Sequence, residues 1–428
     1  MSCIGCRSCL CLRQWFSSQP PGYNRGMAAQ GADVSTRLKI LFVINDLYTR
    51  GNGLAASARR TISLLRERGH DVRVLSAPPR HGDDCGVGVP DYPLPHLRIP
   101  LVAPLIASQG YAFARSDRRQ VDRALDWADV VHLEEPFMLQ AFVARRARAR
   151  GVPALATYHI HPENLTASVY LDRCPLLNRV ILEVWKRFIF NRCDLIQCPS
   201  QSVYDRVLRL RVRPSLLLVS NGVPLDGAVG GDGRQVGESC LIRILAVGRF
   251  SREKDQATIL RALRHSAHAR SIQLTLAGRG PTERSLRASA RRLLRSNVIA
   301  HPVRFAFLSA DELVREVSSS DLYVHAARIE VEGLSALEVL RYGVVPIIAR
   351  GPLTATSQFA LSEDSVYEAG DARALARAID SWVERGSAAR AREARRYVAV
   401  GVRYDIRECI DRLEESYSRL VSEVVSRG

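Results

Sequence analysis

Residues 319–349, SSDLYVHAARIEVEGLSALEVLRYGVVPIIA, predict a strand, a polar loop, a short helix and a second strand. Gly333 marks the expected start of the helix. Glu330 falls on the loop before it, whereas Glu338 falls about one and a half turns into it. A helix start offers unpaired backbone N–H groups and the positive end of a dipole, which suit a phosphate. One carboxylate could therefore face a sugar and the other a ribose, with phosphates between them.

Three further polar segments each follow an apolar, strand-like run. They are AVGRFSREKD (246–255), with Arg249 and Lys254, LAGRGP (276–281), with Arg279, and VSNGV (219–223). Ligands of open α/β sheets bind at the carboxyl ends of strands. Taken singly, two glutamates are usually surface charge, two cations are usually a solvated helix start, and such glycines are usually turn residues. Their occurrence together favours a binding site.

The four segments, in their order and spacing along the chain, resemble those of retaining GT-B glycosyltransferases of the family 4 type, over about residues 38–425. Such enzymes move a sugar from a nucleotide diphosphate donor to an acceptor. The resemblance implies an α/β fold of two Rossmann-like domains that face each other across a cleft, with a C-terminal helix that crosses back to the first domain. It also implies a nucleotide-sugar donor, UDP rather than GDP by family habit, and no cofactor or metal.

The resemblance also assigns roles. Arg249 and Lys254 would neutralise the leaving diphosphate in place of a metal ion, and Glu338 would bind ribose. Glu330 would orient the donor sugar hydroxyls. His159, in TYHIHPEN (157–164), resembles a cleft histidine that touches the transferred sugar. The expected catalytic residues are Glu330, His159, Arg249 and Lys254, and the expected donor-binding residues are Gly53, Arg249, Lys254, Arg279, Gly333, Leu334 and Glu338.

Two positions depart from the family pattern. Glu332 stands where the family often has an aromatic residue, and Arg279 replaces a common acid. Either change could alter the preference for base or sugar. A non-enzymatic alternative is a sugar-nucleotide-binding protein that has lost turnover.

The chain of 428 residues, 46% of them apolar, is long for one domain and natural for two. The run LKILFVI (38–44) predicts a buried strand, and the glycines after it lie too far on for a dinucleotide fingerprint. Residues 221–240 have the Gly- and Asp-rich composition of a linker. We therefore expect an acceptor-side domain over 38–220, a nucleotide-sugar-binding domain over 241–401, and a final helix within 402–428 that packs on the first domain.

Residues 1–37 differ from the rest of the chain, with four crowded cysteines at positions 3, 6, 9 and 11. We expect a disordered leader, with Met27 as an alternative start. Zinc binding, redox chemistry and palmitoylation are the other interpretations. The remaining cysteines are scattered, which favours a reducing compartment. No run of about 18 apolar residues predicts a transmembrane helix.

The formal net charge is +17, from 61 basic and 44 acidic residues. This balance favours acidic partners: a nucleotide sugar, an anionic membrane surface or nucleic acid. No nucleic-acid recognition module accompanies it, so no specific nucleic acid is expected. Segments 98–107 and 180–190 mix apolar residues with arginines, and further basic clusters contain Arg115, Arg118, Arg119, Arg145, Arg146, Arg148 and Arg150.

These segments predict docking on an anionic bilayer, beside a lipid acceptor such as a membrane glycolipid or diacylglycerol. The expected location is cytoplasmic, peripheral on the inner face of the membrane. The alternatives are a polysaccharide or small-molecule acceptor, and ordinary helices with one core side and one solvated side.

Overall fold

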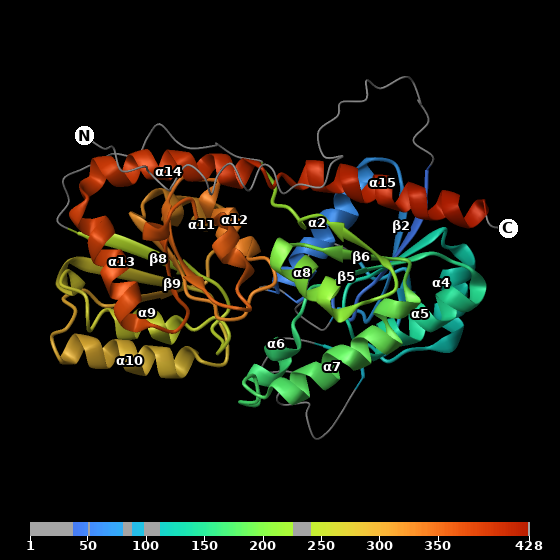
Figure 1. Cartoon of the computed structure of the whole chain (residues 1–428), viewed down its shortest axis with the longest axis horizontal. Helices are drawn as coiled ribbons and strands as arrows, with labels where there is room; N and C mark the ends of the chain where they lie inside the picture. Colours follow the sequence, from blue (N-terminus) through green and yellow to red (C-terminus); the bar gives the residue numbers. More distant parts are fainter. Residues whose placement is uncertain (1–36, 50–51, 80–87, 98–111, 226–240, 427–428) are drawn as a thin grey trace, which may run out of the picture. The chain divides into compact units, whose positions relative to one another are not determined.

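The computed structural model describes residues 37–49, 52–79, 88–97, 112–225 and 241–426. The predicted leader, the apolar segment 98–107 and most of the predicted linker lie outside these ranges. Two parallel sheets with helices on their faces make up the described part (Figure 1). The predicted two-domain Rossmann-like α/β fold is therefore confirmed.

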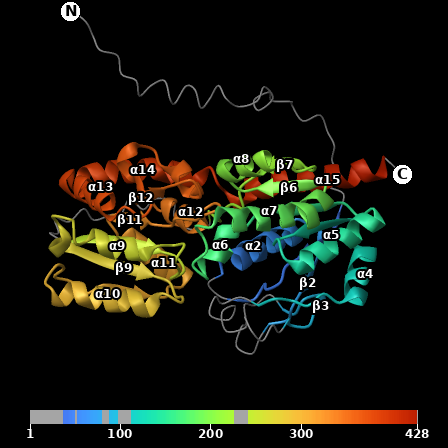
Figure 2. The ribbon, with the colours of Figure 1, turned by 60° about the horizontal axis from the view of Figure 1, so that its bottom comes forward.

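The first sheet has the order β3-β2-β1-β4-β5-β6-β7. Its central strands β1, β4, β5 and β6 are short and almost wholly buried because helices cover both faces, whereas the edge strand β7 is partly exposed. Its strands are β1 (Lys39–Val43), β2 (Asp71–Ser76), β3 (Tyr92–Pro93), β4 (Val130–Leu133), β5 (Ala154–Thr157), β6 (Leu195–Cys198) and β7 (Ser215–Leu218). Its helices, seen in Figure 2, are α2 (Gly53–Glu67), α4 (Arg118–Trp127), α5 (Met138–Arg150), α6 (Pro162–Ala167), α7 (Pro175–Phe188) and α8 (Gln201–Leu210).

The second sheet has the order β10-β9-β8-β11-β12-β13. Its strands are β8 (Ile242–Val247), β9 (Ile272–Ala277), β10 (Arg304–Ala306), β11 (Leu322–His325), β12 (Val345–Arg350) and β13 (Val366–Glu368). The accompanying helices are α9 (Gln256–Ala262), α10 (Glu283–Arg295), α11 (Ala310–Ser318), α12 (Leu334–Leu340), α13 (Ala372–Glu384) and α14 (Gly386–Val402). Single 3-10 turns occupy Phe190–Arg192, Ala269–Ser271, Ala355–Phe359 and Glu363–Ser365.

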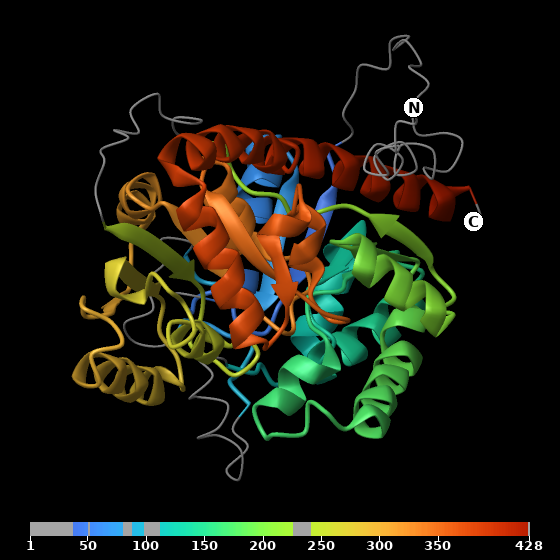
Figure 3. The same ribbon diagram turned by 60° about the vertical axis from the view of Figure 1, so that its left-hand side comes forward.

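The last helix, α15 (Ile406–Val425), packs on the first sheet (Figure 3). Its apolar side chains share one buried cluster with β1 and α2; those of α15 are Ile406, Ile410, Leu413, Tyr417 and Leu420. Spacings of three and four residues place these side chains on one face of the helix. The C-terminal helix thus crosses back to the first domain, as the resemblance implies.

The chain passes between the two halves twice, and the two passages touch. The amide of Ile406 donates to the Val223 carbonyl at 3.0 Å, and the amide of Val223 donates to the Tyr404 carbonyl at 2.9 Å. Gly222 has φ +71°, and a Cβ there would lie 2.5 Å from Cα of Ile406. Only glycine permits this close approach at a left-handed conformation.

No helix within the described ranges is both long enough and apolar enough to span a bilayer.

Candidate active site

The loop between β11 and α12 carries Glu330 at a fixed position. Its amide donates to the Leu353 carbonyl at 2.7 Å, and its carbonyl accepts from the amide of Ala355 at 3.0 Å. Gly333 caps α12 with φ +94°, and a Cβ there would lie 2.0 Å from Cγ2 of Thr356. Glycine is therefore required for the chain to turn from the loop into the helix.

A buried chain of polar groups holds the Glu330 carboxylate. The ammonium of Lys254 donates to Oε2 of Glu330, and Nε2 of His325 lies 3.3 Å from the same oxygen. The hydroxyl of Tyr323 in turn contacts Nδ1 of His325 at 2.9 Å. Burial opposes charge on Glu330, but Lys254 and His325 outweigh it and lower its pKa to about 2. Glu330 is therefore a carboxylate at every physiological pH.

Arg249 begins the loop that also carries Lys254. Nε2 of Gln256 donates to the Arg249 carbonyl at 2.8 Å, which fixes the backbone just after β8. Burial lowers the pKa of the Arg249 guanidinium, and Glu253 counters that effect. Two cations thus lie on one loop at the carboxyl end of a strand, where a sheet of this kind binds ligands.

Glu338 lies on α12 and pairs with a residue of the other half. Nη1 of Arg60, on α2, is 2.7 Å from Oε1 of Glu338. Burial raises the pKa of Tyr323; a hydrogen bond with Ser335 opposes this shift, and the negative charges of Glu330 and Glu338 add to it. Both glutamates thus influence the same tyrosine.

Among the described residues, no hydrogen bond or ion pair joins Lys254 or Glu330 to Gly53 or Arg279. Gly53 is the first residue of α2, beside Asn52, whose side chain accepts from the amide of Leu54 at 3.1 Å. Arg279 is exposed, and its guanidinium lies 4.4 Å from the ring centre of Phe307. Their predicted roles in donor binding stay predictions.

His159 lies in a polar cluster at the carboxyl ends of β4 and β5. Its Nε2 is 2.6 Å from Oε2 of Glu134, a side chain only 3% exposed. Nε2 of His132 lies 3.6 Å from the other oxygen of Glu134. Burial, opposed by Glu134 and aided by His159, lowers the pKa of His132 to about 4. Glu134 thus orients His159, a role that the sequence alone did not indicate.

A second polar group of the first domain contains His161, Glu163 and Arg206. Nη1 of Arg206 lies 3.2 Å from Nδ1 of His161, and Nη2 of Arg206 contacts both oxygens of Glu163 at 2.9 and 3.0 Å. Burial lowers the pKa of His161 to about 3; the charge of Arg206 acts in the same direction and that of Glu330 opposes it. The segment HPEN at positions 161–164 was the signal for this group, although sequence reasoning selected only His159.

The loop containing Glu330 also touches the first domain directly. The hydroxyl of Ser200 donates to the Val331 carbonyl at 2.6 Å. Glu332 accepts from the hydroxyl of Ser220 and from both the amide, at 3.1 Å, and the side chain of Asn221. Burial raises the pKa of Glu332 to about 7, against these hydrogen bonds. Glu332, which departs from the family pattern, therefore connects this loop by hydrogen bonds to the segment that leads from the first half to the second.

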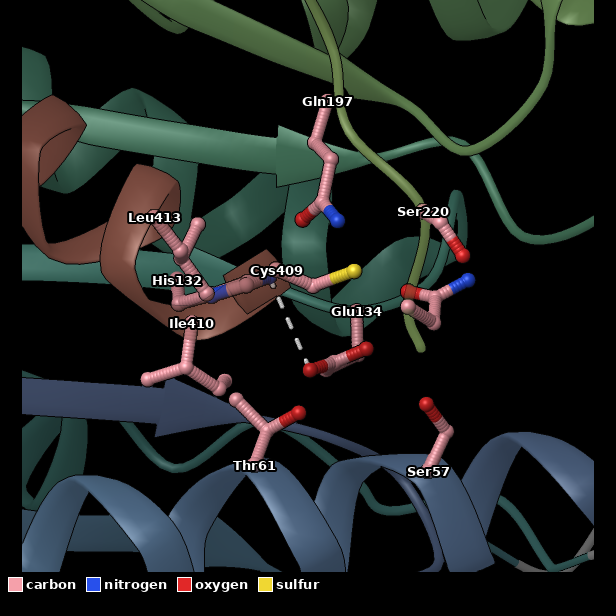
Figure 4. A pocket seen from close by; sticks show the side chains of 10 residues that line it. Ser57, Thr61, His132, Glu134, Gln197, Ser220, Cys409, Ile410 and Leu413 are labelled. Carbon is pink, nitrogen blue, oxygen red and sulfur yellow. Dashed lines mark ion pairs between the residues drawn. The ribbon is translucent and has the colours of Figure 1, made fainter. Parts of the chain in front are cut away.

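A small pocket lies behind the Glu134 cluster, between α2, the ends of β4 and β6, and α15 (Figure 4). Ser57 and Thr61 lie on one side of it, and Glu134, Gln197 and Cys409 on the others. Its volume of about 10 Å³ is far too small for a nucleotide sugar. This pocket is therefore not a candidate for the donor site.

No group of three His, Cys, Asp or Glu side chains within the described ranges is arranged to hold a metal ion. Metal independence stays a prediction.

Comparison with known proteins gives two family matches. Glycosyltransferase Family 4 matches residues 51–226, and Glycosyl transferases group 1 matches residues 241–398. The chain is 26% identical, over 324 residues, to a GDP-mannose-dependent alpha-mannosyltransferase of Mycolicibacterium smegmatis, covering 73% of this chain and 79% of the relative. A Corynebacterium glutamicum protein of the same description is 24% identical over 328 residues, covering 74% of each.

Solved structures agree in fold. Sucrose-phosphate synthase from Thermosynechococcus elongatus superposes with a TM-score of 0.67 at 16% identity, over 90% of this chain and all of the other. Anabaena Alr3699/HepE in complex with UDP-glucose gives 0.66 at 17% identity, with the same coverage. With both halves matched in order, the chain belongs to the GT-B glycosyltransferases of the family 4 type.

Proposed function

We propose that this protein is a retaining, metal-independent glycosyltransferase that transfers a hexose from a nucleoside diphosphate sugar to an acceptor. The observation that carries the proposal is the ion pair of Lys254 with Glu330, because Lys254 shares the loop after β8 with Arg249 and Glu330 lies on the loop after β11. Fixed cations suit a leaving diphosphate, and an ionised carboxylate suits the hydroxyl groups of a sugar.

The donor would contact the second domain along this edge. Arg249 and Lys254 would face the diphosphate, with the backbone amides near Gly333 and Leu334 as further donors. Glu330 would accept from hydroxyls of the transferred sugar, and Glu338 would accept from ribose. His159 and its partner Glu134 would lie on the acceptor side, where His159 would contact the sugar.

In the transfer step, the bond from the anomeric carbon to the diphosphate oxygen breaks and a bond to the acceptor oxygen forms. The acceptor hydroxyl proton passes to an oxygen of the leaving diphosphate, on the same face of the sugar, so the anomeric configuration is kept. The charge that develops on the leaving group is stabilised by Arg249 and Lys254. Lys254 would need little reorganisation in this step, because its ammonium already pairs with Glu330.

The two mannosyltransferase relatives suggest which base and sugar to test first in the donor. Both are described as GDP-mannose-dependent and align with about three quarters of this chain. We therefore place GDP-mannose first and a UDP-sugar, the donor expected from family habit, second. The acceptor expected from the sequence is a membrane glycolipid or diacylglycerol. A polysaccharide or small-molecule acceptor and a non-catalytic role are the alternatives.

A donor screen tests the proposal. Purified protein is incubated with GDP-mannose, GDP-glucose, UDP-glucose, UDP-galactose and UDP-N-acetylglucosamine, with and without total lipid extract. Nucleoside diphosphate release and glycosylated lipid are measured by mass spectrometry, and the anomeric configuration of the product is read by NMR. Turnover with retention is the expected result. Donor binding without turnover would instead support the non-catalytic alternative.

A further inference from the structure

Helix α7 has two apolar faces, and only one of them is covered. Asn178, Leu182 and Trp185 are buried against the first domain. On another side, Leu176, Val180, Val184 and Phe188 are 74%, 52%, 47% and 42% exposed. Their spacing of four residues aligns them along one strip of the helix. A strip of four large exposed apolar side chains on one helix is typical of an interaction surface.

The apolar strip continues beyond α7. Leu165 of α6 and the turn after that helix add side chains that are 37–73% exposed: Leu165, Val169, Tyr170 and Leu171. Helices α6 and α7 lie side by side in Figures 1 and 2. We call these eight side chains, with the cations beside them, the α7 surface.

The strip forms one part of the lining of a hollow, and cations make up half of the residues that line it. Its charged lining consists of one acid, Glu183, and six cations: Arg148, Arg179, Lys186, Arg187, Arg192 and Arg213. Lys186 is 3.5 Å from Glu183. Within the described residues, no carboxylate lies within ion-pair distance of the five arginines. Burial lowers the pKa of Arg192, and repulsion from Arg145, Arg148 and Arg187 lowers it further. Among the described residues, Glu183 is thus the one acidic side chain in this lining.

Not every basic residue selected from the sequence belongs to this surface. Arg146 and Arg150 both pair with Asp122, and Arg118 lies 3.6 Å from the same carboxylate. These three cations therefore have carboxylate partners, Asp122 and, for Arg150, also Asp126. By contrast, no ion pair in the described part of the chain involves the five arginines beside α7.

We infer that the α7 surface docks the protein on an anionic lipid bilayer. Apolar side chains at the centre of the strip suit the boundary between headgroups and acyl chains, and unpaired arginines suit anionic headgroups. Nucleic acid explains the arginines but not four exposed aliphatic and aromatic side chains in a row, because phosphate contacts need no apolar strip. An anionic bilayer uses both features.

The surface leads from the bilayer to the candidate active site. Helix α6 begins just after His161, whose pKa responds to Glu330. In the turn after α6, the ring centre of Tyr170 lies 3.6 Å from the guanidinium of Arg252. Arg252 precedes Lys254 by two residues on the same loop. A lipid acceptor held by α7 would therefore enter beside the donor loop. This last step rests on the proposed function, whereas docking itself does not.

Flotation with vesicles tests the inference. Full-length protein is mixed with phosphatidylcholine vesicles containing 0 or about 30% phosphatidylglycerol, at low and high salt. At low salt, the protein should bind the anionic vesicles but not the neutral ones. High salt should release only part of the bound protein, because it screens the charges but not the inserted apolar side chains. Arg179→Glu with Arg187→Glu should weaken binding at least twenty-fold, since each cation near such a surface contributes about fivefold.

Apolar insertion has its own variant. Val180→Asp with Val184→Asp changes only exposed positions, and should remove the binding that survives high salt. The matched control is Arg291→Glu with Arg295→Glu on α10, an equal charge change at exposed positions of the second domain. It should keep most of the vesicle binding.

Three results would overturn the inference. They are an absence of binding to anionic vesicles, equal losses in the α7 and α10 variants, and a dimer in solution that the α7 variants dissociate. Nucleotide affinity and donor hydrolysis are measured on the same samples. Loss of vesicle binding with intact hydrolysis, or the reverse, separates a failure of the docking inference from a failure of the proposed function.

Discussion

The guanidinium of Arg60 on α2 lies 2.7 Å from one carboxylate oxygen of Glu338 on α12, which joins the two halves at the residue assigned to ribose. The side chains are 35% and 24% exposed, so the ion pair itself contributes little stability. One oxygen of Glu338 is thus held by Arg60, and under the proposed function the other would accept from the ribose.

The first prediction separates these two roles of Glu338. Glu338→Ala should weaken binding of the nucleoside diphosphate by about tenfold or more, because hydrogen bonds to a charged group contribute roughly 1.5–3 kcal/mol. Arg60→Ala should change it less than about threefold. Titration calorimetry with GDP and UDP measures both. Equal affinity of wild type and Glu338→Ala would remove the ribose role.

The second prediction concerns Glu330. Glu330→Gln should reduce kcat by roughly 10²-fold, while the affinity for free nucleoside diphosphate changes little, because the assigned partner of Glu330 is the sugar. Initial rates and calorimetry give the two numbers. A variant that loses nucleotide affinity and turnover equally would show that Glu330 acts on the nucleotide instead.

The third prediction concerns pH and stability at Glu332. Its folded pKa of about 7 exceeds the ordinary 4.5, so the folded chain binds more protons than the unfolded chain between these values. The contribution of Glu332 to the free energy of unfolding is therefore highest below about pH 4.5, and falls as pH rises towards 7. Glu332→Gln should raise Tm at pH 8 and have little effect at pH 5.

Differential scanning calorimetry at the two pH values measures this effect. Comparing each variant with wild type at the same pH cancels the opposite trend from His132 and His161, which are buried in the neutral form. Glu368→Gln, at an exposed position, is the control and should leave Tm unchanged at both pH values. A Tm increase of the same size at both pH values for Glu332→Gln would contradict the titration.

The fourth prediction is that catalysis needs no divalent ion. Arg249 and Lys254 supply fixed positive charge, so EDTA should leave the initial rate within about twofold of the untreated protein. Activity abolished by EDTA and restored by Mg²⁺ or Mn²⁺ would show that the two cations are not sufficient.

Local patterns in the sequence predicted much of the fold. The apolar run before Asp46 forms β1, and the stripe from Ile406 to Leu420 forms the buried face of α15. Gly333 ends the loop and starts α12, as expected from its place between a polar and an apolar stretch. Such features depend on neighbours within a few residues, which a pattern reports directly.

The contacts that complete the site depend on residues far apart in the chain. Arg60 and Glu338 are separated by 278 positions, and Ser200 and Val331 by 131. His325, at the end of β11, contacts the same oxygen of Glu330 as Lys254 does. This arrangement depends on how the strands and loops come together in the fold. No periodicity encodes such pairings, so Arg60, Glu134, His161 and Arg206 were not selected as site residues. Glu332 was noticed only as a departure from a family pattern.

The most direct test of the central claim is the turnover of the Arg249→Ala/Lys254→Ala double variant with the best donor from the screen. Loss of one such cation costs about 10²–10³ in rate, so the double variant should fall at least 10²-fold below wild type. Arg264→Ala, an exposed arginine of the same domain, should keep wild-type turnover. Full turnover in the double variant would contradict the assignment of these two cations to the leaving diphosphate.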